Sequence, residues 1–281
     1  MEIIYSLMES ILPFSWVNFT FMKNAFLAIL LITPLFGLVG TMIVNNKMSF
    51  FSDALGHCAL TGIALGVILG ISNYSVAMLG FSIIFALGIS VIMQSETSSS
   101  DTIIGVFSSA GIALGVFILS FSGGFSKYSS YLVGDILSIT KKEILVLAIT
   151  LVVVIIVWIL SFNKLLLSGL NTEMAMSKQI NTKFYKNVFV VLIAIIVTIS
   201  LKWVGMLMIN SLLVLPAAAS RNIAKNMKIY HLLSVIFSFF SGISGLLISY
   251  YIGTSAGSTI VLIAAIIFFI TYFISRCKNF R

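Results

Sequence analysis

The stretch EILVLAITLVVVIIVWIL, residues 143–160, holds a single charged side chain, Glu143, at its first position. A helix needs about 20 predominantly apolar residues to cross the hydrocarbon core of a bilayer, within a range of about 17–25. The stretch therefore predicts a membrane-spanning helix. Further runs of the same kind occur at residues 25–44, 54–71, 75–93, 102–120, 187–201, 203–219, 231–251 and 257–275.

Two of these runs leave the number of spans open. The run at 187–201 is short, and Lys202 alone separates it from the run at 203–219. This pattern is typical of a tight hairpin or of a broken helix, so we expect eight or nine spans. Glycine and serine recur within the runs, and such small residues let helices approach closely in lipid. The sequence predicts an all-α, polytopic transmembrane helix bundle in the cell membrane.

The composition of the chain leads to the same fold class. Of its 281 residues, 60% are hydrophobic and 9% are charged, and the mean hydropathy is +1.17. A soluble domain carries roughly 25% charged residues, so this chain cannot build a water-facing surface of its own. The longest stretch without a strongly apolar run, residues 161–187, is too short for a separate soluble domain. No phosphate-binding loop of the type G-x-x-x-x-G-K-[S/T] occurs, so any ATP that drives the protein must bind to another chain.

The net charge of +8 predicts the orientation of the bundle rather than a nucleic-acid partner. Cytoplasmic loops of membrane proteins carry an excess of lysine and arginine. If the C-terminus is cytoplasmic, eleven of the 16 basic residues lie inside: Lys47, Lys164, Lys178, Lys183, Lys186, Arg221, Lys225, Lys228, Arg276, Lys278 and Arg281. The other five lie outside: Lys23, Lys127, Lys141, Lys142 and Lys202. With nine spans the N-terminus is then outside, and with eight it is inside.

Three segments are expected along the chain. Residues 1–17 contain Glu9 and Pro13 and predict a segment that lies at the membrane interface instead of crossing it. Residues 18–275 form the membrane domain, and residues 276–281 form a basic cytoplasmic tail. The start of the chain has no basic residue before Lys23 and does not resemble a secretory signal peptide.

Asp53 and His57 stand out among the few ionisable residues near the apolar runs. Their spacing of four places both side chains on one face of a helix, one turn apart. An ionisable group at membrane depth is costly and usually has a function. A carboxylate with an imidazole suits borderline divalent metals such as Zn²⁺ and Mn²⁺, and a site with two ligands is able to release its ion. The alternative is that Asp53 caps the helix N-terminus and His57 packs within the bundle.

Three other residues, His231, Cys58 and Asp135, are weaker candidates for metal ligands. His231 opens an apolar run and is expected at the membrane interface. Cys58 follows His57, about 100° around the helix, and is expected to pack as a small hydrophobe away from the ligand face. The other cysteine lies in the basic tail, so no disulfide framework is expected. Asp135 lies in a loop rich in Ser, Gly and Tyr and is expected to be solvated, the alternative being a place in an extracellular vestibule.

The segment at residues 215–228 is the other stretch that predicts a functional element. A span is expected to end near Pro216, and a short basic helix with small residues is expected to follow on the cytoplasmic side. Such a helix is able to dock in a groove of a soluble partner. The alternative is a plain basic loop that only fixes the orientation of the bundle.

Four stretches, in this order along the chain, resemble the permease subunits of bacterial ABC importers for zinc and manganese, the ABC-3 family. They are SDALGHCALTGIALG (52–66), YLVGDIL (131–137), KWVGMLMINSLLVLPAAASR (202–221) and GSTIVL (257–262). The resemblance covers about residues 19–273. It implies that residues 18–275 are a permease domain and that Asp53 and His57 lie on the route of the ion. It also implies a cytoplasmic helix that contacts the ATPase, at about residues 217–228, which includes Ala217, Ala218, Ser220, Arg221 and Lys225.

The same resemblance implies the partners of the chain. A second permease copy, two cytoplasmic ATP-binding cassette subunits and an extracytoplasmic metal-binding protein would complete the importer, surrounded by membrane lipid. Zinc or manganese would be the cargo of an alternating-access cycle, no bound cofactor is expected, and the chain would catalyse no covalent chemistry. Two positions depart from the family pattern. Cys58 stands where relatives often have alanine or serine, and residues 45–47 (NNK) stand where relatives are commonly more basic.

Three other functions fit parts of the sequence. An ABC permease for a siderophore, haem or a vitamin commonly has more spans and does not need the Asp–His pair. An ion-coupled secondary transporter would work without an ATPase, but acids are sparse, no internal repeat is visible and the basic segment after Pro216 argues against it. An intramembrane metalloprotease would need an H-E-x-x-H motif, which the sequence lacks. The two visible ligands do not choose between Zn²⁺, Mn²⁺ and Fe²⁺.

Overall fold

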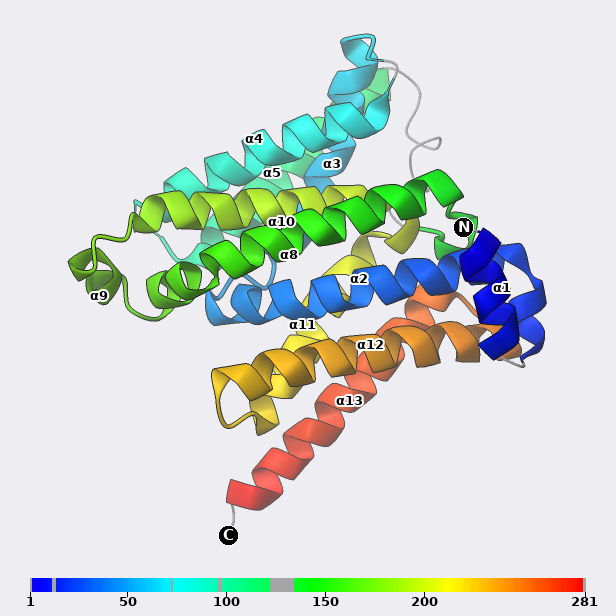
Figure 1. Ribbon diagram of the computed structural model, residues 1–281. Coiled ribbons are helices and arrows are strands. Elements are labelled where there is room, and N and C mark those ends of the chain that lie inside the picture. The colour runs from blue at the N-terminus through cyan, green and yellow to red at the C-terminus, as the bar shows by residue number, and fades with distance from the viewer. Residues whose placement is uncertain (1, 12–13, 72, 96–97, 122–133, 280–281) are drawn as a thin grey trace.

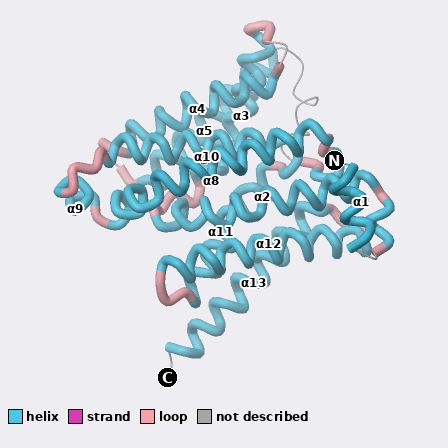
Figure 2. The backbone as a smooth tube through the Cα atoms, viewed as in Figure 1, coloured by secondary structure: helices cyan, strands magenta, loops and turns pink. Residues whose placement is uncertain are grey.

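The computed structural model describes residues 2–11, 14–71, 73–95, 98–121 and 134–279. Within these ranges the chain forms helices and no strand, and Figure 2 shows the loops that join them. The long helices are α2 (Thr20–Asn45), α3 (Phe51–Ile68), α4 (Tyr74–Met93), α5 (Ser100–Phe121), α8 (Lys141–Leu170), α10 (Thr182–Val204), α11 (Met206–Ile223), α12 (Met227–Ile252) and α13 (Ala256–Asn279). The short elements are α1 (Glu2–Ile11), η1 (Ser15–Asn18), η2 (Ile136–Ser138) and α9 (Thr172–Ser177).

Each predicted apolar run corresponds to one long helix of the bundle. Eight of these helices, all except α11, are long and apolar enough to cross a bilayer by length and composition, in the part of the chain that the structure describes. The predicted polytopic helix bundle is therefore confirmed. Four predicted features lie outside the described residues: Pro13 of the interfacial segment, Lys127 of the expected outside set, residues 131–133 of the second family stretch, and the last two residues of the basic tail.

The two runs on either side of Lys202 form a tight hairpin that turns at Gly205. Lys202 lies in the last turn of α10, whose 23 residues make the short predicted run a full helix. Gly205 has φ 78° and ψ 155°, a backbone conformation that is almost exclusive to glycine. A single residue in this conformation ends α10 and allows α11 to start back through the bundle at Met206.

Two helices extend further than the apolar runs predict. α8 has 30 residues and continues through Ser161 and Lys164 to Leu170, so the first part of the less apolar stretch at 161–187 is helical. α11 continues through Pro216 to Ile223, so the expected end of a span near this proline is wrong. Proline is tolerated inside a membrane helix because neighbouring helices and local adjustments accommodate the backbone groups that it leaves free.

The helix directions place the two ends of the membrane domain on opposite sides of the bundle. α12 runs antiparallel to α2, because Tyr230 bonds to the Thr41 carbonyl (3.4 Å) while Ser234, one turn later, bonds to the Gly37 carbonyl, one turn earlier (2.7 Å). α13 returns antiparallel to α12, so α2 begins at the end opposite to the C-terminus (Figure 1). This direction agrees with an odd number of crossings, which is nine when α11 is counted with the eight helices named above.

Basic side chains gather at one end of the bundle, which we call the basic end. It carries the last turns of α2, α8, α11 and α13 and the first turns of α10 and α12, with Lys47, Lys164, Lys183, Lys186, Arg221, Lys228 and Arg276. The opposite end carries Lys23, Lys141, Lys142 and Lys202. The positive-inside rule predicts that the basic end is cytoplasmic, and α2 would then begin outside.

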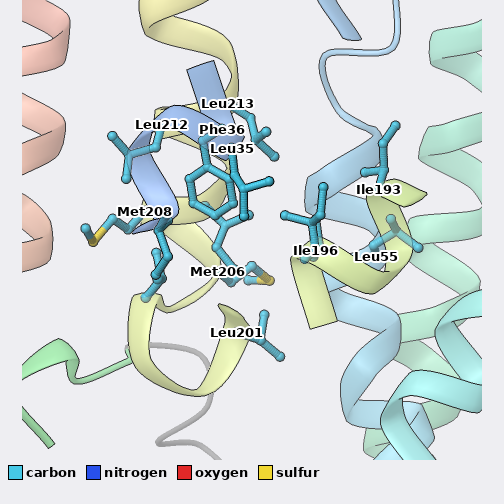
Figure 3. Packing of buried hydrophobic residues seen from close by; sticks show 14 of the residues in the cluster. Leu35, Phe36, Leu55, Ile193, Ile196, Leu201, Met206, Met208, Leu212 and Leu213 are labelled. Carbon is cyan, nitrogen blue, oxygen red and sulfur yellow. The ribbon is translucent and has the colours of Figure 1, made fainter. Parts of the chain in front are cut away.

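The core lies where α2, α3, α10 and α11 meet (Figure 3). It is built from large apolar side chains that are almost fully buried, among them Leu35, Phe36, Leu55, Ile193 and Leu213. The helices approach closely at Gly40, where a methyl group would lie 1.9 Å from the Leu213 carbonyl oxygen. This contact fixes α11 against α2.

Candidate functional site

Asp53 and His57 lie in the first two turns of α3, at a place where most of the helix is buried. α3 begins at Phe51, its N-cap is Phe50, and no side chain caps it. Asp53 is therefore inside the first turn and not the cap, so the capping alternative is wrong. A carboxylate in the first turn is still favoured by the positive end of the helix dipole.

The two side chains face each other at a distance that suits a shared ion. The Asp53 Oδ2 atom lies 3.6 Å from the His57 Nε2 atom, which is too long for a hydrogen bond. Two ligands that each lie about 2.1 Å from one tetrahedral ion are about 3.4 Å apart. The pair thus needs only a small adjustment to hold a divalent ion between its two ligand atoms.

The pair is partly open, in contrast to its neighbours on the helix. The side chains of His57 and Asp53 are 23% and 32% exposed, whereas Ser52, Leu55 and Gly56 are buried. Among the described residues no cluster of three His, Cys, Asp or Glu side chains is placed to hold a metal. Within one copy of the chain, the described residues therefore place two candidate ligands of these types at this turn.

Cys58 points away from the pair. It is fully buried, its Sγ atom donates to the Leu55 carbonyl (3.3 Å), and a methyl group at Gly111 of α5 would lie 3.2 Å from its Cβ atom. The thiol thus packs between α3 and α5. The prediction that Cys58 fills space as a small hydrophobe agrees with this position.

His231 and Asp135 are separate from the pair and have structural partners of their own. His231 is buried in α12, its Nδ1 atom lies 2.7 Å from the Met227 carbonyl, and the ring of Phe162 crosses its ring at 5.1 Å. His231 lies in the second turn of α12, near the basic end, so its expected position at the membrane interface stays a prediction. Asp135 is exposed and accepts a hydrogen bond from the Leu137 amide (3.0 Å), which caps η2.

Two residues of α11 contact the turn of α3 that carries Asp53 and His57. The Ser52 hydroxyl donates to Asn210 Oδ1 (2.9 Å), directly before Asp53. A methyl group at Gly56, directly before His57, would lie 2.6 Å from Met206 Cγ, so these helices touch. Sequence reasoning did not single out Met206 or Asn210. The sequence signal that could have identified Asn210 is its amide side chain, which stands in the otherwise apolar start of α11.

The residues expected to contact an ATPase lie at the basic end, in one continuous helix and the link after it. Ala217 and Ser220 are fully buried, Ala218 is partly buried, and Arg221 and Lys225 are exposed. The expected separate helix at 217–228 is wrong, because α11 runs on to Ile223 and α12 begins at Met227. Since α11 also touches the Asp53 turn, a single helix connects the exposed Arg221 to the turn that carries the pair.

The chain is similar to named transport proteins over almost its whole length. It is 30% identical over 263 residues to the manganese import system permease protein ScaB of Streptococcus gordonii, covering 94% of each chain. It is 30% identical over 236 residues to the high-affinity zinc uptake system membrane protein ZnuB of Haemophilus influenzae, covering 84% of this chain and 90% of that protein.

A solved structure and a family model agree with these likenesses. The structure described as PsaBC from Streptococcus pneumoniae in complex with Fab matches with a TM-score of 0.78 and 26% identity, covering 97% of this chain and 95% of the other. The model of the ABC 3 transport family matches residues 18–275. The sequence resemblance is therefore confirmed, and the chain belongs to the ABC 3 transport family.

Proposed function

We propose that this chain is the membrane-spanning permease of an ATP-driven importer for a divalent transition-metal ion, Zn²⁺ or Mn²⁺. The observation that carries the proposal is the Asp53–His57 pair, with its ligand atoms 3.6 Å apart on a partly open turn of α3. A carboxylate and an imidazole are ligands that both ions accept. The relatives named for manganese import and zinc uptake support the same cargo class.

Asp53 and His57 would act as a transient stop on the ion route. Two protein ligands hold an ion weakly, and a transport site must release its ion. Water or a second permease copy would supply the remaining ligands, because the described residues offer no third one nearby. The ion would thus pass the pair without being trapped as it would be in a closed structural site.

The ATPase would bind at the basic end. The exposed residues Arg221 and Lys225 offer it positive charge, and the chain itself has no phosphate-binding loop. An extracytoplasmic metal-binding protein would deliver the ion at the opposite end. ATP binding and hydrolysis in the partner would move α11 and reopen the route inward, which is a rigid-body form of alternating access. The chain would catalyse no covalent step.

Metal accumulation in cells tests this proposal. The chain is expressed with its candidate ATPase and metal-binding protein in a host that lacks zinc and manganese importers, and cell-associated metals are measured by mass spectrometry. We expect Asp53→Ala and His57→Ala to abolish accumulation at matched membrane levels. Asp101→Ala is the matched control, because Asp101 is also an acid in the first turn of a long helix, α5, but has no histidine one turn away.

Each other outcome has a definite meaning. Accumulation by both variants at the wild-type level would remove Asp53 and His57 from the ion route. Accumulation that persists with a hydrolysis-deficient ATPase would indicate a secondary transporter. No metal accumulation by wild type, with its partners shown to assemble, would redirect the search to a siderophore, haem or vitamin cargo.

A further inference from the structure

A groove of about 410 Å³ opens on the side of the bundle between α1, α2 and α8, at the end opposite to the basic end. Its walls include Ile4 of α1, Leu27 and Leu30 of α2 and Leu145 of α8. Apart from two lysines, Lys141 and Lys142, every side chain that lines it is hydrocarbon. The groove is thus apolar with one charged end.

The charged end lies at the start of α8, where a membrane surface would be. Lys141 and Lys142 are the first two residues of α8, and Ala148, which also lines the groove, lies two turns further along. With a rise of 1.5 Å per residue, the groove reaches about 10 Å from the lysines into the apolar part of the bundle. This arrangement matches a molecule with a polar head and a hydrocarbon chain.

The positive charge at the mouth of the groove is not neutralised by the protein. Of the acids nearby, Glu9 is paired with Lys23, and Glu143 accepts hydrogen bonds from Lys202 (2.7 Å) and from Thr140. In the part of the chain that the structure describes, neither Lys141 nor Lys142 forms an ion pair. Both are exposed at the first turn of a helix, where the dipole adds further positive potential.

The first helix is fixed in place to form one wall of the groove. The Tyr5 hydroxyl donates to Asn24 Oδ1, and Asn24 Nδ2 donates to the Ile139 carbonyl just before α8 (3.1 Å). The Lys141 ammonium lies over the Tyr5 ring, 5.3 Å from its centre. A neutral aromatic ring therefore orients Lys141 beside the groove and leaves its charge available.

We propose that this groove binds an anionic phospholipid of the surrounding bilayer. Its phosphate meets Lys141 and Lys142, and one acyl chain fills the apolar channel past Ala148. A zwitterionic lipid such as phosphatidylethanolamine fits less well, because its own ammonium group would approach two lysines. The bound lipid packs against Ile4 and so joins α1 to α2 and α8. This site is independent of the proposed metal route.

Native mass spectrometry of the purified full-length chain tests the proposal, with phosphatidylglycerol and phosphatidylethanolamine of identical acyl chains as probes. We expect phosphatidylglycerol to bind at least about tenfold more tightly. Lys141→Gln with Lys142→Gln should weaken it about 25-fold, since each lysine near an anionic group contributes about fivefold. Lys141→Arg with Lys142→Arg should bind as wild type does.

Two further variants separate the groove from general charge effects. Lys178→Gln with Lys183→Gln removes two exposed lysines at the other end of the bundle and should leave binding unchanged. Ala148→Trp fills the channel and should weaken phosphatidylglycerol binding although both lysines remain. The proposal is overturned if wild type binds the two lipids equally, if the glutamine variant keeps the preference, or if Ala148→Trp binds as wild type does. Displacement of the lipid by millimolar inorganic phosphate would likewise overturn it in favour of a free anion.

Discussion

The Ser52 hydroxyl donates a hydrogen bond to Asn210 Oδ1 across 2.9 Å, joining residues that are 158 positions apart in the chain. Ser52 immediately precedes Asp53, and Asn210 lies in the first half of α11, which ends at the exposed basic residues. The bond therefore connects the turn that carries the candidate metal ligands to the helix that would contact an ATPase.

Ser52→Ala should uncouple transport from ATP hydrolysis. The lost hydrogen bond lowers the free energy of unfolding by about 1 kcal/mol and loosens α3 from α11. We expect metal uptake per ATP hydrolysed to fall severalfold, while the ATPase activity of the assembled importer persists. Uptake and hydrolysis are measured together in proteoliposomes that contain the complete importer.

Ser90→Ala is the matched control for this change. Ser90 also donates to an asparagine Oδ1 atom, that of Asn187 (2.7 Å), but it joins α4 to α10 and not α3 to α11. Because Gln94 also donates to Asn187 Oδ1 (3.1 Å), the loss of Ser90 should lower stability by no more than the loss of Ser52 does, and it should leave the ratio of uptake to hydrolysis unchanged. Equal effects of both variants on that ratio would show that the Ser52 bond only stabilises the fold.

Gly40→Ala should destabilise the bundle strongly. The new methyl group would lie 1.9 Å from the Leu213 carbonyl oxygen, and backbone atoms of two packed helices cannot move aside separately. Overpacking typically costs about 1–3 kcal/mol, and we expect the upper end or more. Gly80→Ala in α4 is the control, because no atom lies within 4 Å of its added methyl group. Thermal unfolding in detergent should show a large drop for the first variant only.

The membrane helices were predictable because burial in lipid demands a long apolar run, which is a local property of the sequence. The helix ends were less predictable. Lys164 interrupts the apolar pattern without ending α8, and Pro216 lies inside α11 because the surrounding helices support its backbone. Gly205 differs from these two residues because it does lie at a helix end, where its glycine-specific backbone conformation allows the hairpin to turn.

The candidate site was predictable only in part, for a similar reason. A spacing of four determines that Asp53 and His57 share a helix face, so the pair follows from the sequence alone. Its partners on α11 do not, because Ser52 and Asn210 meet through the packing of helices that are far apart in the chain. The same holds for His231, whose aromatic surroundings come from another helix, α8.

Reversing the charge of Arg221 and Lys225 should impair assembly with the ATPase. Both side chains are exposed at the basic end, so Arg221→Glu with Lys225→Glu should not disturb the core. We expect the amount of ATPase that co-purifies with the chain to fall about tenfold, equivalent to about 1.4 kcal/mol. Lys178→Glu with Lys183→Glu makes the same change of charge at exposed positions on the same end. Equal losses for both double variants would indicate a general charge effect instead of a docking surface.

His57→Glu should change which metal the importer accumulates. The variant keeps two ligands one turn apart on α3 but replaces an imidazole by a carboxylate. Carboxylates suit Mn²⁺, whereas imidazole favours Zn²⁺, so the ratio of manganese to zinc taken up from an equimolar mixture should rise. A rise of about tenfold corresponds to about 1.4 kcal/mol of discrimination.

His231→Gln should leave the ratio unchanged, because the ring of His231 is enclosed by Trp158, Phe162 and Tyr230. If His57→Glu lowers uptake of both ions by the same factor, the pair lies on the ion route without selecting the ion.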